Sequence, residues 1–286
     1  MVTDAKTPTK FGLHVSIAGK IDRAVDRAIE KTCDTFQVFT RNPRGWRSKR
    51  LRPNDAAEFR RKILLSGIGP VVSHMPYLAN LSSPKRAIHR KSVKVLVEEL
   101  DRCDALGIPY IVTHLGSHLG KGWRFGLEQL TEAINTAFDR SQSKTTLLLE
   151  NTAGTLDSMG SSFEDMQQVM DLVCESRVAI CFDTCHAFAA GYDLRDAKSV
   201  ETTISEVRHS VGLNSLRIVH ANDSKGELAS RVDRHEHIGL GYIGAEGFRA
   251  ILHADVFRRL PIILETPLDV SGADVTNLRR IRELAE

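Results

Sequence analysis

The segment Cys181-Phe-Asp-Thr-Cys-His-Ala-Phe-Ala-Ala-Gly-Tyr-Asp193 directly follows Arg177-Val-Ala-Ile180, which begins an apolar run of strand length without helical spacing. This order places Asp183 and His186 where a buried strand gives way to a loop. Parallel α/β enzymes use a carboxylate and an imidazole at the carboxyl end of a strand to hold a metal or a substrate. The same arrangement recurs at other strand ends, and this recurrence predicts both a fold and a site.

Short apolar runs alternate with longer amphipathic segments along the whole chain. The predicted strands are 11–16, 35–40, 70–74, 110–115, 146–151, 178–184, 216–223 and 261–266. The predicted helices are 21–31, 53–66, 84–106, 123–140, 163–173, 197–209, 244–253 and 273–285. Alternating strands and helices indicate an α/β parallel sheet, and eight units favour closure into a (β/α)8 TIM barrel. A doubly wound sheet is the alternative, but no glycine-rich dinucleotide loop follows the first strand.

Length and composition agree with one barrel domain. The chain has 286 residues, of which 42% are hydrophobic and 26% charged, and we predict a flexible extension at residues 1–10 before a single domain at 11–286. A formal charge of +3 is too small to identify a partner. The odd number of cysteines and the absence of a Cys-x-x-Cys pair predict reduced thiols. Without a signal-peptide pattern or a membrane-length apolar run, we expect an intracellular, non-secreted protein with no membrane partner.

Chemically active side chains stand at the ends of nearly all the predicted strands. The residues are His14 and Ser16, His74, His114, Glu150, Asp183 with His186, His220 and Glu265, and the loop after the seventh strand adds Asp233 and His235. A single histidine at a strand end is more often a structural residue than a ligand. However, a carboxylate that enters a barrel core needs a cation or several donors, and several buried acids would repel one another. The sequence therefore predicts metal ions at the carboxyl ends of the strands.

Histidine and carboxylate ligands suit zinc, and manganese or iron would also be accepted. Leaving out His14 and Ser16, five histidines and four carboxylates remain, and nine ligands are too many for one tetrahedral ion, so two or three ions are expected. Three divalent ions against four carboxylates leave a positive site, for which a phosphodiester is the obvious anion, and clustered metals hydrolyse phosphoesters by activating water. Cys181 could also supply a ligand, but we interpret Cys181 and Cys185 as small buried thiols because the nitrogen and oxygen ligands suffice.

Two loops would border this site. Residues 41–52 hold six basic residues and no acid, with Trp46 among them. Such a loop could simply be a solvated basic surface. At the rim of an electropositive site it would instead contact a phosphate backbone, and Trp46 would be a group able to stack or wedge. Tyr77 and Leu78 follow the third strand, where they either cover the core or insert into a widened minor groove.

These residues together resemble the endonuclease IV family of apurinic/apyrimidinic endonucleases, from about Phe11 to the final helix. The motifs that carry the resemblance are Asp-Thr-Cys-His-Ala-Phe-Ala-Ala-Gly-Tyr-Asp (183–193), Ser-Arg-Val-Asp-Arg-His (230–235), Leu-Glu-Asn-Thr-Ala-Gly (149–154), Gly-Ser-His-Leu (116–119) and Leu-Glu-Thr (264–266). The chain departs from the usual family pattern at Lys20, Leu115 and Leu240. None of these departures removes a predicted ligand.

The resemblance implies a DNA-repair enzyme with three zinc ions that acts in base excision repair. It assigns one ion to His74, His114 and Glu150, a second to Glu150, Asp183, His220 and Glu265, and a third to His186, Asp233 and His235. Glu150 and Glu265 would be catalytic, and Glu265 would help to orient or deprotonate the water. Arg44, Tyr77 and Leu78 would contact DNA and hold an abasic nucleotide out of the helix. The implied partner is double-stranded DNA containing abasic sites, cut 5′ to the lesion by a monomer that associates with the nucleoid when it acts.

Two other functions are possible on the same residues. A sugar isomerase or epimerase also gathers histidines and acids at strand ends, but it typically holds one or two ions and needs no basic rim loop. A DNA-damage-binding protein without catalysis is the other alternative, and the intact predicted ligands argue against it.

Overall fold

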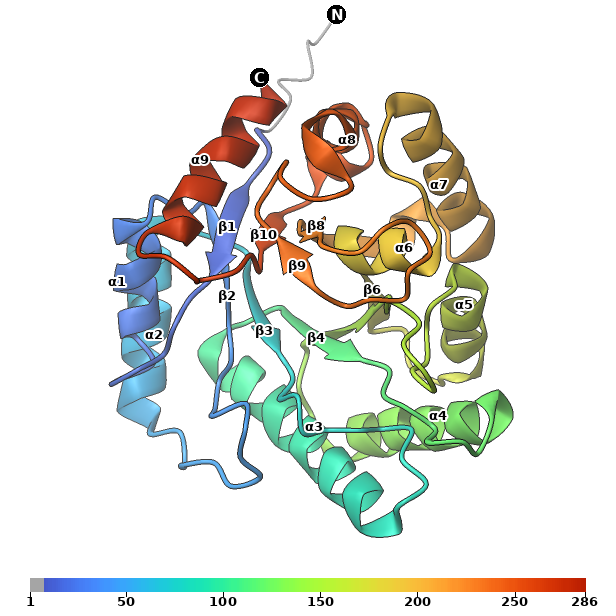
Figure 1. Ribbon diagram of the computed structural model, residues 1–286. Coiled ribbons are helices and arrows are strands. Elements are labelled where there is room, and N and C mark those ends of the chain that lie inside the picture. Colours follow the sequence, from blue (N-terminus) through green and yellow to red (C-terminus); the bar gives the residue numbers. More distant parts are fainter. Residues whose placement is uncertain (1–7) are drawn as a thin grey trace, which may run out of the picture.

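The computed structural model describes residues 8–286 and confirms the predicted barrel. Within this range, eight parallel strands close in the order β1-β10-β7-β6-β5-β4-β3-β2, with helices around them (Figure 1). The barrel strands are β1 Phe11–His14, β2 Thr35–Val38, β3 Val71–His74, β4 Tyr110–His114, β5 Thr146–Glu150, β6 Val178–Asp183, β7 Leu216–His220 and β10 Ile262–Leu264. The helices outside them are α1 Arg23–Glu30, α2 Pro53–Ser66, α3 Arg86–Leu106, α4 Trp123–Arg140, α5 Phe163–Leu172, α7 Ala197–Ser210, α8 Gly244–His253 and α9 Ala273–Ala285.

Of the predicted extension at 1–10, residues 1–7 lie outside the described part of the chain. The Thr9 hydroxyl donates to the Arg258 carbonyl at 2.7 Å, and the Ile262 amide donates to the Lys10 carbonyl at 2.8 Å. The chain is therefore tied to the barrel before its first strand begins. Among residues 8–286, no helix is long and apolar enough to cross a membrane.

The expectation of a loop after Asp183 is wrong, because helix α6 (Thr184–Ala190) begins there. The Asp183 side chain accepts a hydrogen bond from the His186 amide at 2.7 Å and so caps the first turn. The alanines of this segment favour a helix, and Gly191 ends it with a φ of 118°. The helix thus carries His186 in its first turn, directly beside the Asp183 carboxylate that caps it.

The long polar loop predicted after the seventh strand contains more structure than expected. Strand β7 ends at His220 and not at Asp223, which instead begins the short strand β8 (Asp223–Ser224). This strand pairs antiparallel with β9 (His235–Glu236), and β8 lies next to α6 (Figure 1). Two short 3₁₀ helices, η1 (Leu213–Ser215) and η2 (Phe257–Arg259), complete the described elements.

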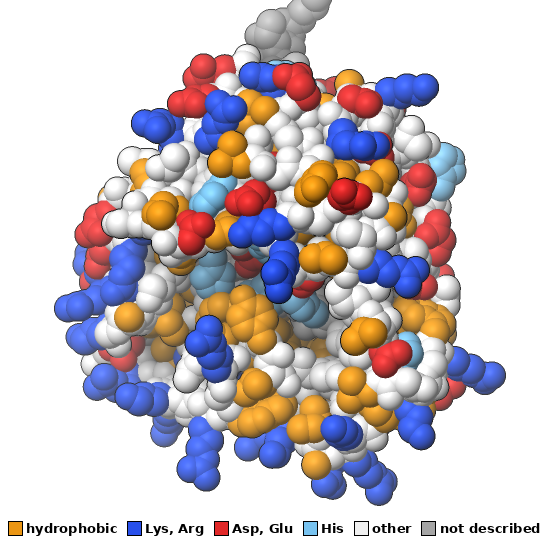
Figure 2. Space-filling view, in the orientation of Figure 1, with side chains coloured by type: hydrophobic (Ala, Val, Ile, Leu, Met, Phe, Trp, Pro, Cys, Tyr) orange, Lys and Arg blue, Asp and Glu red, His pale blue; other side chains and the backbone are white. Residues whose placement is uncertain are grey.

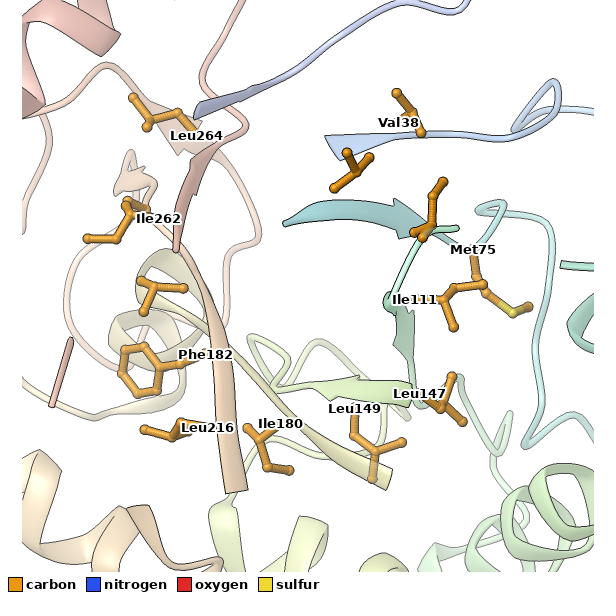
Figure 3. Packing of buried hydrophobic residues seen from close by; sticks show 14 of the residues in the cluster. Val38, Met75, Ile111, Leu147, Leu149, Ile180, Phe182, Leu216, Ile262 and Leu264 are labelled. Carbon is orange, nitrogen blue, oxygen red and sulfur yellow. The ribbon is translucent and has the colours of Figure 1, made fainter. Parts of the chain in front are cut away.

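Side chains alternate between two separate cores because successive residues of a strand point to opposite faces. The outward set packs against the helices, and its members, such as Val38, Leu149 and Phe182, are arranged around the ring of strands (Figure 3). The inward set forms a smaller cluster of Val72, Val112, Leu148, Ala179, Cys181, Ile218 and Ile263. This cluster fills the barrel and leaves the last inward position of each strand for other side chains.

Candidate metal centre

The last inward positions form a ring of polar side chains at the carboxyl ends of the strands. In strand order they are His14, Gln37, His74, His114, Glu150, Asp183, His220 and, directly after β10, Glu265. Two residues before each of them, the same strand has another inward-facing residue, whose side chain is smaller or apolar. This spacing arises because side chains alternate between the two faces of a strand. Figure 2 shows histidine side chains gathered in a hollow near the middle of this face, with Lys and Arg side chains around it. The ring thus lies where TIM-barrel enzymes carry their active sites.

Shared carboxylates join the ligand-type residues into one centre. The groups whose ligand atoms lie within 4.8 Å of one another are His74–His114–Glu150, Glu150–Cys181–His220, Asp183–His186–His235 and Glu150–Asp183–His220–Glu265. Glu150 is common to three of these groups and Asp183 to two. Glu150 and Asp183 would therefore each help to hold more than one ion.

Glu150 lies at the middle of the centre and is fully buried. Its Oε2 is 3.0 Å from His114 Nε2 and 3.2 Å from His74 Nε2, and its Oε1 is 2.8 Å from His220 Nδ1. Burial raises the pKa of Glu150, but His220 and His114 outweigh burial and hold that pKa well below its usual range. Glu150 is therefore an anion directed at histidines on three sides.

Residues of α6 and of the β8–β9 segment form the other end of the centre. Asp233 Oδ1 lies 3.1 Å from His186 Nε2 and 3.6 Å from His235 Nε2. Burial lowers the pKa of His186, but Asp183 and then Asp233 more than compensate and raise it to about 10. Asp183 also lies within reach of this group, which the assignment based on the family resemblance did not include.

Backbone carbonyls select the ring nitrogen that faces the centre. The Nδ1 atom of His74 lies 2.7 Å from the Met75 carbonyl, that of His186 lies 2.9 Å from the Asn151 carbonyl, and that of His235 lies 3.0 Å from the Glu265 carbonyl. A carbonyl can only accept, so each Nδ1 donates its proton to a carbonyl and each Nε2 is left facing the centre. Metal-binding histidines are oriented in the same way in proteins.

The donor set fits divalent cations. His235 Nε2 is buried without a hydrogen-bond partner among the described residues, and it belongs to the group that contains Asp183 and His186. A buried ring nitrogen with an unused lone pair is costly, and a cation at this position would satisfy it. Imidazole nitrogens and carboxylate oxygens in groups of three or four are the ligands that zinc prefers.

Comparison with known proteins identifies the family of the chain. Residues 25–285 match the family model described as xylose isomerase-like TIM barrel. The chain is 55% identical to the probable endonuclease 4 of Methanoculleus marisnigri over 96% of this chain and 98% of that protein, and 46% identical to that of Nitrosopumilus maritimus over 96% and 100%. The chain belongs to the endonuclease IV family.

Solved structures agree with this family assignment. The crystal structure of endonuclease IV from Thermus thermophilus superposes with a TM-score of 0.84 at 36% identity, covering 96% of this chain and 98% of that one. A D-tagatose 3-epimerase-like protein also superposes, with a TM-score of 0.69 at 19% identity over 96% of each chain. The second likeness shows only that the endonuclease IV barrel is shared more widely.

Sequence reasoning missed amide side chains that hold the ligands of this endonuclease IV chain. Asn151 binds both backbone groups of Asp183, through Oδ1 at 2.8 Å and Nδ2 at 3.0 Å. Asn222 donates to Asp183 Oδ2 at 2.7 Å and accepts from the Glu265 amide at 2.8 Å. Gln37 contacts both His220 and Glu265. Asn151 and Asn222 lie within two positions of a predicted ligand, and this proximity was the signal available in the sequence.

The predicted DNA contacts of this endonuclease IV chain lie at the rim of the centre. Tyr77 is 61% exposed and Leu78 is 38% exposed, both after β3. The Tyr77 ring centroid lies 5.9 Å from that of His74 and 5.2 Å from that of Phe39, so Tyr77 extends over the histidines. Arg44 is exposed in the loop after β2. The three side chains therefore share the face that contains the ligands.

Two members of the basic loop have structural positions that the sequence did not indicate. Arg41 is buried, and its guanidinium is paired with Glu99 and Glu98. It is therefore not available to a phosphate, contrary to the expectation for this loop. Trp46, suggested above as a group able to stack or wedge, packs partly buried against the core with the Lys91 ammonium 5.6 Å from its ring centroid. The buried part of this loop thus anchors the exposed part.

A surface pocket of about 700 Å³ lies apart from the centre, between the end of the basic loop and α3. None of the predicted ligands lines it, but several basic side chains do, among them Arg60 and Arg102. Arg60 donates to the Ala105 carbonyl and Arg102 to the Thr40 carbonyl. Because these cations already have partners in the chain, we assign the chemistry to the centre.

Cys181 and Cys185 agree with the interpretation as buried thiols, whereas Cys174 is exposed. All five lie in the described range, and none forms a disulfide there. Burial raises the pKa of Cys181 to about 12, although the thiol lies beside Glu150 and His220. Cys181 belongs to the apolar inward cluster one step below the ring of polar residues, where a small thiol packs well.

Proposed function

We propose that this chain is an apurinic/apyrimidinic endonuclease of DNA repair. It would cut the phosphodiester 5′ to an abasic site in double-stranded DNA, leaving a 3′-hydroxyl and a 5′-deoxyribose phosphate. The observation that carries the proposal is the set of ligand groups joined by Glu150 and Asp183 on a face that also holds Arg44 and Tyr77. Full-length identity with probable endonuclease 4 proteins supports it. We further propose that the protein acts as a monomer on chromosomal DNA inside the cell.

The proposed ligand sets are those implied by the family resemblance. They are His74, His114 and Glu150 for one zinc ion, Glu150, Asp183, His220 and Glu265 for a second, and His186, Asp233 and His235 for a third, with manganese or iron accepted in one of them. When bound, such ions activate water at neutral pH and neutralise charge on the leaving oxygen. The short distances from Asp233 to His186 and His235 support its place in the third set.

The protein's own groups would orient the attacking water. Glu265 Oε1 accepts from Gln37 Nε2 at 2.6 Å, and Glu265 Oε2 lies 3.4 Å from His220 Nδ1. The carboxylate therefore has a fixed direction. Burial raises its pKa, but His220 and then His14 outweigh burial and keep that pKa below its usual range. An ionised, fixed carboxylate can accept the proton of a water molecule beside it. We propose this role for Glu265, while Glu150 holds neighbouring parts of the centre together.

Recognition of the lesion would depend on the rim. Apolar side chains that enter the minor groove unstack neighbouring bases, and an abasic nucleotide is easy to extrude because it has no base to unstack. Tyr77 and Leu78 are exposed apolar groups at the edge of the centre, and Arg44 is an exposed cation in the loop after β2. We propose that these three residues hold the DNA open while the extruded sugar-phosphate enters the hollow.

One experiment tests fold, site and reaction together. Metal content per chain is measured on purified protein, and the same sample is incubated with a duplex that carries one abasic site. We expect close to three zinc-like ions and a cut on the 5′ side of the lesion. Two ions or fewer with an uncut duplex would contradict the proposal, and epimerisation of a ketose would then identify the sugar enzyme. Tight binding of abasic DNA without incision would identify the damage-binding protein.

A further inference from the structure

One position in the ring of polar inward residues has no ionisable side chain. Gln37, at the end of β2, is fully buried between histidines and a carboxylate. Its Nε2 donates to Glu265 Oε1 at 2.6 Å and lies 3.1 Å from His14 Nδ1, and its Oε1 lies 2.9 Å from His220 Nε2. The amide thus has a partner for both of its hydrogens and for its oxygen.

The direction of each hydrogen bond follows from the chemistry of the partners. The ionised Glu265 carboxylate can only accept, so the nitrogen of the amide must face it and the oxygen must face His220. His220 therefore carries its proton on Nε2. Its other nitrogen, Nδ1, faces Glu150 Oε1 at 2.8 Å and Glu265 Oε2 at 3.4 Å, and is therefore the atom left for an ion that these carboxylates would also hold.

This orientation is the reverse of that of the neighbouring histidines. In His74, His186 and His235 a backbone carbonyl binds Nδ1 and leaves Nε2 for the centre. His220 has a side-chain amide in that role, on a different strand and on the opposite nitrogen. The ligand atom of His220 thus depends on a residue that can be substituted without altering the backbone.

We propose that Gln37 is a positioning residue of the metal centre, which selects Nδ1 of His220 as the ligand atom and fixes the direction of the Glu265 carboxylate. The inference rests on the proposed function, because it assigns His220 and Glu265 to the same ion. A smaller or apolar side chain in place of Gln37 would deprive both His220 Nε2–H and Glu265 Oε1 of a buried partner. Removal of such an outer partner typically costs roughly 10- to 100-fold in metal affinity or activity.

The test compares Gln37→Met with Thr35→Val. Methionine has nearly the shape of glutamine but makes neither hydrogen bond, and Thr35 is a buried residue of the same strand whose hydroxyl binds the Pro70 carbonyl away from the centre. Zinc retained per chain is measured against increasing chelator, together with kcat and KM for incision of the abasic duplex. We expect Gln37→Met to lose one ion at roughly 10-fold less chelator. Its kcat should fall with little change in KM, whereas Thr35→Val should keep all its zinc.

Three outcomes would overturn the inference. The first is wild-type zinc retention and kcat in Gln37→Met, and the second is an equal loss of zinc in both variants, which would indicate only damage to the strand. The third needs no variant: nitrogen NMR of the wild-type holoprotein should show His220 protonated on Nε2, and protonation on Nδ1 would be decisive against it. If wild-type protein leaves abasic duplex uncut, the proposed function fails. The positioning role of Gln37 is then still tested by zinc retention and by the NMR assignment of the His220 proton.

Discussion

At the scale of single residues, a substitution of Glu265 can separate incision of DNA from binding of abasic DNA. Glu265→Gln keeps the shape of the side chain but removes the charge that could accept a proton from water. We expect incision to fall by about 10²- to 10⁴-fold, the usual effect of losing a general base, with binding of abasic DNA largely kept. Single-turnover incision and a binding titration measure the two effects. Wild-type turnover in this variant would contradict the assigned role, and Glu128→Gln on the exposed face of α4 provides the matched control.

Arg44 should affect recognition without affecting the metals. Its side chain is exposed in the loop after β2 and makes no part of the groups of ligand atoms among the described residues. We expect Arg44→Ala to weaken binding to abasic duplex while zinc content stays unchanged. If Arg44 neutralises one phosphate, the slope of log affinity against log salt should also fall by about one. Arg124→Ala, at a side chain that is 92% exposed on α4, should change neither quantity. Loss of zinc in Arg44→Ala would mean that the loop is structural.

At the scale of elements, the basic loop depends on a buried connection to α3. Arg41 Nε donates to Glu99 Oε1 at 2.5 Å, and the Thr40 hydroxyl donates to Glu99 Oε2 at 2.7 Å. Glu99→Ala would leave the Arg41 cation buried with less compensation, so we expect a loss of about 3 kcal/mol in the free energy of unfolding. Urea denaturation measures it. Glu128→Ala removes an ion pair from the exposed surface of α4 and should cost at most about 1 kcal/mol. Equal costs in the two variants would show that the buried pair is no anchor.

The elements also show what the sequence could and could not reveal. The barrel strands and the helices packed around them were predictable from the sequence. Each strand corresponds to a short apolar run, and each of these helices corresponds to a longer amphipathic segment. Helix α6 was not, since Asp183 appeared to be a ligand at a strand end while it also caps the helix that presents His186. Periodicity cannot reveal a segment of seven residues buried on most sides. The ligands lay at predictable strand ends, but no local pattern distinguishes a glutamine such as Gln37 from an ordinary strand residue.

At the scale of the whole molecule, the centre should contribute to stability as well as to chemistry. Each ion present at 100 times its dissociation constant adds about 2.7 kcal/mol to the free energy of unfolding, and for a chain of this size each kcal/mol shifts the melting temperature by about 2–4 °C. We therefore expect chelation to lower the Tm by at least about 5 °C, with recovery on adding zinc. Calorimetry with the chelator, and with the same chelator already loaded with zinc as control, measures this. An unchanged Tm after removal of all metal would show that the centre binds its ions too weakly to support the fold.

The separation of the two cores also has an evolutionary consequence. The outward side chains hold the helices in place, and the inward ring at the mouth shares none of its residues with them. A lineage can therefore exchange histidine, acid or amide at the ring without repacking the scaffold. The barrel of a D-tagatose 3-epimerase-like protein overlays this one at only 19% identity, so the same fold is compatible with very different sequences. New chemistry on this framework can therefore arise from substitutions on that circle of positions, with α6 and the β8–β9 segment supplying further groups, as His186 and His235 do here.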